Sequence, residues 1–369
     1  MVVTERNIQD GDLPLTAVAL VVRRSRIGRW NEVLTAATVV CCLALLAVFV
    51  STNLTGRFDH RTETIQQQFA ILAGGPYPIN GEPNDVGAYQ NRVLFPFVLR
   101  LGTSVGIVSV GEWYLLLRLA TAAMAFLVVW WLLRAVAQAQ PRLAIIGLGL
   151  LTYELIFTFS QGWEHPTDFP DIAITGLWVW AALSQRKFAI FFLSLLAAFN
   201  RESAAFAGVL WIALYGISSG RSLQPRQIGF GMLLSVASYA TVLAIRWSFG
   251  GFTAVIDNTN VSDLLQTLPR FGETLRSFLA HPTPWSWPVL LAAMAILPLG
   301  WIWANRISLG LREKRMLLAA AAVALLSLPF SSLDEPRDFT TSIVLLIFVA
   351  VAAEAGRHHS QPQLDVSRN

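Results

Sequence analysis

Long apolar runs alternate with short polar breaks along most of the chain. The runs are continuous and rich in Leu, Ala and Val, and several approach the roughly 20 residues that a helix needs to cross hydrocarbon. Strands of a membrane barrel would instead alternate apolar and polar residues in segments of about 10. The pattern therefore predicts an all-α integral membrane protein with about ten transmembrane helices.

The expected spans follow from window length and from the positions of the basic breaks. They cover residues 32–51, 112–133, 143–159, 171–183, 188–199, 203–217, 228–249, 285–304, 316–330 and 339–354. We expect residues 1–31 to be cytoplasmic and to lead into an uncleaved first span. The polytopic domain then covers residues 32–356, and residues 357–369 form a disordered cytoplasmic tail.

Charge sets the expected orientation. Every predicted cytoplasmic break contains Arg or Lys, whereas the other breaks hold most of the acids. The positive-inside rule then places the N- and C-termini in the cytoplasm and the acidic breaks outside. Hydrophobic residues make up 54% of the chain and charged residues 14%, so we attribute the net charge of +4 to topology rather than to nucleic-acid binding. Cys41 and Cys42 are too few for a disulfide framework or a metal cluster.

The first outer loop, residues 52–111, is expected to contain interfacial helices. Residues 62–73 carry Ile65, Phe69 and Leu72 at helical spacing, which predicts an amphipathic helix along the outer leaflet. Residues 92–110 are apolar enough to cross, but a crossing there would turn the basic breaks outward. We therefore expect a half-buried helix on the outer face.

Two candidate groups lie in this loop. Asp59 follows the first span and is a candidate general base or metal ligand, although an acid at a helix start also serves as a solvated cap. Tyr89 and Arg92 stand beside aromatic residues, where an arginine can hold a phosphate through paired hydrogen bonds. The alternative for this pair is a headgroup-level anchor.

The second outer loop gathers Glu164, His165, Asp168 and Asp171 within one short stretch. These oxygen and nitrogen groups could orient a hydroxyl or, with Asp59, hold a divalent cation such as Mg²⁺ or Mn²⁺, with Asp59, His165 and Asp168 as its ligands. The spacing matches no standard metal motif. The alternative is that Asp168 and Asp171 only cap the following helix.

Two further turns carry charge. Asn200, Arg201 and Glu202 lie between short apolar runs, where charged groups are costly and usually functional; the alternative is an Arg201–Glu202 pair that satisfies itself. Glu335 and Arg337 stand between the last two expected spans, where the alternative is a charged turn. The grouping of all these clusters on one predicted face favours an active site there.

These motifs resemble the GT-C superfamily of membrane glycosyltransferases over most of residues 33–354. The likeness consists of the acid in the first outer loop, the amphipathic helix after it, the stretch from Tyr89 to Pro96, the acidic second loop, the Asn-Arg-Glu turn and the late Glu-x-Arg. Where the family usually has paired acids after the first span, this chain has Asp59 followed by His60.

The resemblance implies transfer of a sugar from a polyprenyl-phosphate donor to a glycan, lipid or protein acceptor of the cell envelope, at the outer face of a bacterial plasma membrane. Asp59 would take the proton of the acceptor hydroxyl, and Arg201 or Arg337 would stabilise the phosphate leaving group. Asp168 and Asp171 would position the sugar or a metal. Direct displacement implies inversion at the anomeric carbon.

Two other readings stay open. A transporter or lipid flippase also has ionisable groups in its helices, although no internal repeat is visible here. A non-catalytic membrane subunit would keep the fold without the chemistry.

Overall fold

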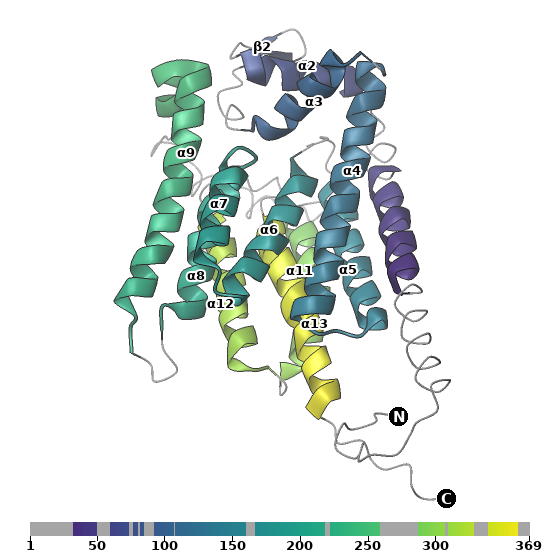
Figure 1. The fold of residues 1–369 in the computed structure, drawn as a ribbon, viewed down its shortest axis with the longest axis vertical. Coiled ribbons are helices and arrows are strands. Elements are labelled where there is room, and N and C mark those ends of the chain that lie inside the picture. The colour runs from purple at the N-terminus through teal and green to yellow at the C-terminus, as the bar shows by residue number, and fades with distance from the viewer. Residues whose placement is uncertain are drawn as a thin grey trace, which may run out of the picture.

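The computed structural model describes residues 32–49, 60–73, 77–79, 82–84, 92–106, 108–159, 167–217, 222–258, 287–306, 309–327 and 339–360. These residues are almost entirely helical, with one short antiparallel hairpin, and form a helical bundle with a cap across one end (Figure 1). The all-α prediction is confirmed for this part of the chain.

A helix lies at each position where a span was expected. The first helix is Glu32–Phe49. Those that follow are α4 (Val110–Trp131), α5 (Pro141–Phe159), α6 (Asp168–Leu183), α7 (Lys187–Ala198), α8 (Phe206–Tyr215), α9 (Pro225–Asn258), α11 (Trp287–Ala304), α12 (Leu311–Ser327) and α13 (Thr340–Ser360). Two short turns complete them, the π-helical η2 (Leu132–Val136) after α4 and the 3-10 turn η3 (Glu202–Ala205) before α8.

Within the described residues, four helices are long and apolar enough to cross a membrane: Glu32–Phe49, Val110–Ala135, Pro225–Ser248 and Thr340–Arg357. Helix length explains why three of the other expected spans fail this test. At 1.5 Å of rise per residue, α6, α7 and α8 reach only about 24, 18 and 15 Å, short of a hydrocarbon core of about 30 Å. The apolar helices indicate a bilayer environment, and the number of crossings stays a prediction.

The centre of the bundle is formed by α6 and α13. Nearly every residue from Asp168 to Ala182 is buried, and so is α13 from Thr340 to Ala355 apart from the half-buried Leu346. Helix α6 contacts α4, α7, α8 and α13, and α13 also contacts α5, α11 and α12. A helix that is apolar on all sides lies either in lipid or inside a protein, and here other helices surround α6 and α13. These two helices therefore form the support on which the polar residues are held.

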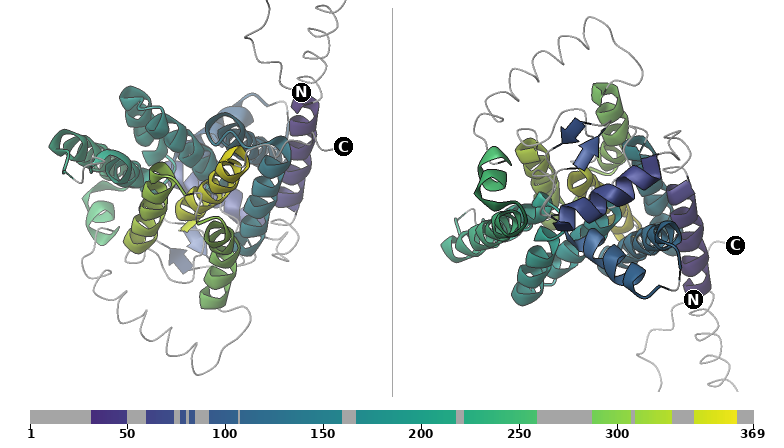
Figure 2. Two further views of the ribbon diagram at one scale, coloured as in Figure 1. Left: turned by 90° about the horizontal axis from the view of Figure 1, so that it is seen from below. Right: turned by 90° about the horizontal axis from the view of Figure 1, so that it is seen from above.

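The cap consists of α2 (His60–Ala73), the hairpin of β1 (Tyr77–Ile79) and β2 (Glu82–Asn84), and α3 (Leu94–Ser104). Seen from above in Figure 2, α2 lies across the end of the bundle. The helix expected over residues 62–73 is therefore present. Its apolar side chains face protein rather than lipid, because Ile65 and Phe69 pack on Phe95, Leu99 and Tyr114.

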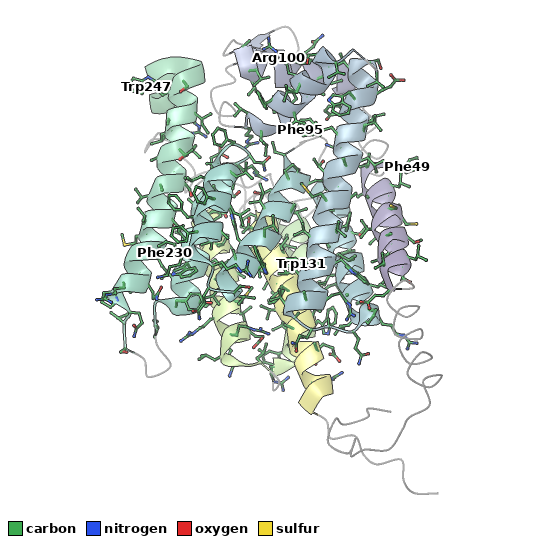
Figure 3. All side chains as sticks on the ribbon, in the orientation of Figure 1. Phe49, Phe95, Arg100, Trp131, Phe230 and Trp247 are labelled. Atoms are coloured by element: carbon green, nitrogen blue, oxygen red, sulfur yellow. The ribbon has the colours of Figure 1, made fainter. Side chains whose placement is uncertain are left out.

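The segment expected to stay half-buried on the outer face is α3, and it does not run along the bundle (Figure 1). Its C-terminal end fits tightly on α4, because a Cβ on Gly102 would come within 1.8 Å of the Trp113 indole. The start of α4 is fixed by a capping box in which Ser109 and Glu112 satisfy each other's backbone N–H groups. Phe95 lies between cap and bundle in Figure 3.

The breaks that were expected to face the cytoplasm lie together at one end of the bundle (Figure 1). Three breaks lie at the end opposite the cap, namely those between α4 and α5, between α6 and α7, and between α11 and α12 (Figure 1). The start of the first helix and the end of α13 lie at the same end. At this end Arg134 pairs with Glu32. The starts of α4 and α6 and the turn η3 lie at the cap end. The placement of that end outside the cell stays a prediction.

Candidate functional site

The first turn of α6 holds two buried carboxylates, Asp168 and Asp171, each 2% exposed. Arg201 Nη1 lies 3.2 Å from Asp168 Oδ1, and the Ser203 hydroxyl donates to Asp171 Oδ1 at 2.7 Å. Both partners come from the turn between α7 and α8. The turn forms because α7 ends at Ala198 and the backbone becomes extended at Arg201 before η3 begins.

The same turn carries Glu202, which faces the other way and joins the cap to the bundle. Arg92 Nη2, just before α3, lies 3.5 Å from Glu202, and Arg246 Nη2 on α9 lies 2.6 Å from it. A backbone bond from Leu94 N to Phe199 O, 2.9 Å long, fastens the start of α3 to the same turn. Helix α9 reaches the level of the cap, where Figure 3 labels Trp247, the neighbour of Arg246.

A further arginine, Arg118 on α4, is fully buried and stands over the ring of Phe169 at 5.5 Å. Its charge also acts on Asp168. We use the name ionic cluster for the seven charged residues that these contacts connect. They are Arg92, Arg118, Asp168, Asp171, Arg201, Glu202 and Arg246.

The two central acids of the ionic cluster have opposite titration behaviour. Burial raises the pKa of Asp168 to about 6, and the repulsion of Asp171 adds to this effect, whereas the attraction of Arg201 opposes it. Burial also disfavours the charge on Glu202, but Arg92 and Arg246 outweigh it and lower the pKa of that carboxyl to about 2. Glu202 is therefore a permanent anion, whereas Asp168 can exchange a proton near neutral pH.

The structure decides between some of the alternatives left open by the sequence. The alternative of a self-contained Arg201–Glu202 pair does not hold, because the two side chains form ion pairs with other residues on α6, α9 and the segment before α3. Capping alone does not account for the acids of α6 either. The cap residue Thr167 makes no side-chain capping bond, and both carboxylates contact the α7–α8 turn instead.

Six of the predicted site residues are described by the structure and lie in or beside the ionic cluster: Arg92, Asp168, Asp171, Asn200, Arg201 and Glu202. Asn200 is fully buried, and its Nδ2 donates to the Thr167 carbonyl at 3.0 Å. The other candidates lie outside the described residues: Asp59, Tyr89, Glu164, His165, Glu335 and Arg337. Asp59 immediately precedes α2 in the chain.

The predicted metal site stays a prediction, since Asp59 and His165 are not described. Within the ranges that the structure describes, no three Asp, Glu, His or Cys side chains lie close enough to hold an ion. The described carboxylates of the ionic cluster are Asp168, Asp171 and Glu202, and arginines already contact Asp168 and Glu202.

Sequence reasoning missed Arg118, Arg246 and Thr167. A signal for the two arginines was present, because each interrupts a long apolar run and charged residues inside membrane helices are usually functional. Thr167 gave no such signal.

No family model matches the chain, and neither a curated protein nor a solved structure shows significant similarity to it.

Proposed function

We propose that the protein is a membrane glycosyltransferase that moves a sugar from a polyprenyl-phosphate donor to a cell-envelope acceptor at the outer face of the membrane. The observation that carries this proposal is the ionic cluster, where arginines from four segments meet two acids of α6 and Glu202 of the α7–α8 turn beneath a helical cap. Charged groups buried in an apolar bundle are costly, so a cluster of this size at one end favours a catalytic or binding role.

The reaction uses groups of the kinds gathered here. The acceptor oxygen attacks the anomeric carbon, the bond from that carbon to the phosphate oxygen breaks, and the acceptor proton passes to a carboxylate. Asp59 is the proposed base, and Asp168 and Asp171 position the donor sugar or a divalent cation. Negative charge returns to the phosphate as it leaves, and a nearby arginine such as Arg201 stabilises it.

The position of the ionic cluster suits a lipid-linked donor. It lies where the cap joins the bundle, and the apolar helices around it indicate a bilayer. A donor anchored by a polyprenyl tail keeps its phosphate at headgroup level, so the chemistry has to occur at a bundle end. The attack from the side opposite the phosphate inverts the anomeric centre.

A transporter is the second candidate, and one observation favours it. Arg118 and Arg246 lie inside α4 and α9, two helices long enough to cross the membrane, and are almost fully buried. Charged side chains in such positions also mark transport paths. The two functions differ in whether a covalent product forms.

Complementation of a strain that lacks the gene tests the proposal. Mass spectrometry of its envelope glycans is expected to show one missing sugar, restored by the wild-type chain and by Glu32→Gln. Glu32 is a suitable control because it forms an ion pair with Arg134 at the opposite end of the bundle. Asp59→Asn and Asp168→Asn are expected to fail. Unchanged glycans in the deletion strain, or full restoration by both site variants, would contradict the proposal.

A further inference from the structure

Two buried polar groups beside the Asp168–Arg201 pair have no hydrogen-bond partner among the residues that the structure describes. Within this part of the chain, Asn200 Oδ1 and Thr167 Oγ1 each lack a donor or acceptor at bonding distance. Asn200 is 0% exposed and Thr167 3% exposed, so bulk water does not satisfy either group. Buried polar atoms in native proteins are nearly always paired, and leaving one unpaired is unfavourable.

The two groups occupy the same place in the fold. The Asn200 side chain is held at the head of α6 because its Nδ2 donates to the carbonyl of Thr167 itself. Asn200 Oδ1 belongs to the same planar amide, and Thr167 Oγ1 branches from the residue that this amide contacts. The next residues along the two segments, Asp168 and Arg201, form the buried ion pair of the site. A ligand at the ion pair therefore has both unpaired groups beside it.

The chemistry of the two atoms restricts the ligand. Asn200 Oδ1 can only accept a hydrogen bond, and Thr167 Oγ1 can both accept and donate. A phosphate offers acceptors alone and cannot satisfy the amide oxygen. An apolar tail satisfies neither. Hydroxyl groups on a ring satisfy both, because each can donate to Asn200 or exchange bonds with Thr167.

We propose that Thr167 and Asn200 form the subsite that binds hydroxyl groups of the donor sugar. This inference rests on the proposed function and adds to it the residues that distinguish a sugar-bearing lipid from the bare polyprenyl phosphate. The arginines of the ionic cluster hold the phosphate, and the uncharged pair at the head of α6 holds the ring. A site that hydrogen-bonds hydroxyl groups discriminates strongly against ligands that lack them.

The test compares two lipids on the purified full-length chain in nanodiscs. The affinity for polyprenyl phosphate is measured first, and then that for polyprenyl-phosphate glucose, mannose and arabinose, by competition against a fluorescent polyprenyl phosphate. The wild type is expected to prefer at least one sugar-bearing lipid over the bare one. Thr167→Val and Asn200→Ala are each expected to lower that preference roughly three- to tenfold and to leave binding of the bare lipid unchanged.

Two matched controls separate this role from a structural one. Thr152 is also a buried threonine, but its hydroxyl donates to the Leu148 carbonyl at 2.9 Å. Asn305 is also a buried asparagine, and its Nδ2 donates to the Trp301 carbonyl at 3.0 Å on α11, near the end opposite the cap. Thr152→Val and Asn305→Ala are expected to keep the full preference for the sugar-bearing lipid.

The outcomes distinguish this inference from the function on which it rests. If the wild type binds none of the lipids, the proposed function and the subsite both fail. If it binds the bare lipid but prefers none of the three sugars, or if both site variants keep the preference, the subsite fails and the proposed function stands. Thr167→Val preserves the shape of the side chain, so it decides the matter alone if Asn200→Ala does not fold.

Discussion

Removing Asp168 and removing Arg201 from their ion pair are expected to change the stability of the protein differently as pH varies. The side chains are 2% and 5% exposed and lie 3.2 Å apart. Removing one partner of a buried pair usually costs about 3–5 kcal/mol, because the other charge is left without compensation. Arginine stays charged at any accessible pH, whereas a buried aspartate can take up a proton and become neutral.

Asp168→Asn leaves Arg201 beside a neutral amide. Because the raised pKa means that Asp168 is itself about half neutral at pH 6, we expect this variant to cost less than the usual value, about 1–3 kcal/mol at most, at pH 6 and at pH 8.5 alike. Arg201→Met leaves Asp168, whose pKa is already raised to about 6 and rises further without Arg201. The folded pKa then lies above the unfolded value, so this variant loses stability as pH rises. We expect a cost of about 1–3 kcal/mol at pH 6, that of a buried neutral acid with an unmet bond, and a larger cost at pH 8.5.

Titration of each variant with SDS, followed by tryptophan fluorescence, measures these free energies of unfolding. The chain contains 13 tryptophans, of which Trp178 and Trp211 are almost fully buried. The double variant is expected to cost less than the sum of the two single ones, because neither charge is stranded. A cost that changes with pH by the same amount in both single variants would refute the reasoning.

Two further predictions concern neighbouring groups. The pKa of Glu202 is lowered from 4.5 to about 2 by Arg92 and Arg246, so the stability it contributes is present above pH 4.5 and is lost as pH falls toward about 2. The shift corresponds to about 3 kcal/mol, which we reduce to about 1–2 because the side chain is 31% exposed. Unfolding at several pH values should show Glu202→Gln less stable by that amount at pH 7 and equal to wild type near the acid limit; a gap that persists there would contradict this origin. Without ligand, Thr167→Val is expected to be stabilised by about 1 kcal/mol or more, because it removes a buried hydroxyl that has no partner among the described residues; a loss of stability would show that the hydroxyl is satisfied.

The sequence predicted the helices well because their signal is local. Continuous apolar runs bounded by charged breaks located the helix at each expected span and the helix over residues 62–73. The number of membrane crossings was harder to predict from the sequence, because α6, α7 and α8 are apolar but too short to cross the membrane alone. Length, rather than hydropathy, separates these helices from the four that qualify.

The candidate site was predictable in its residues but not in its pairs. Charge in apolar surroundings identified Asp168, Arg201 and Glu202, yet their partners depend on which helices lie side by side. Asp168 and Arg201 are 33 positions apart, and Glu202 and Arg246 are 44 apart. The alternative that paired Arg201 with its sequence neighbour Glu202 therefore does not describe the ion pairs that form. Arg118 and Arg246 could have been found by asking which charges interrupt the longest apolar runs.

Direct observation of sugar transfer tests the central claim. Proteoliposomes containing the purified chain would receive polyprenyl-phosphate sugars labelled in the sugar, together with an extract of envelope glycans and lipids as acceptor, and the label remaining on the polyprenyl lipid would be followed over time. We predict that label leaves the donor and appears in a covalent product with wild-type protein and Glu32→Gln, and stays on the donor with Asp168→Asn. Label that remains on the donor with wild-type protein, or the same rate of loss with Asp168→Asn, would contradict the account.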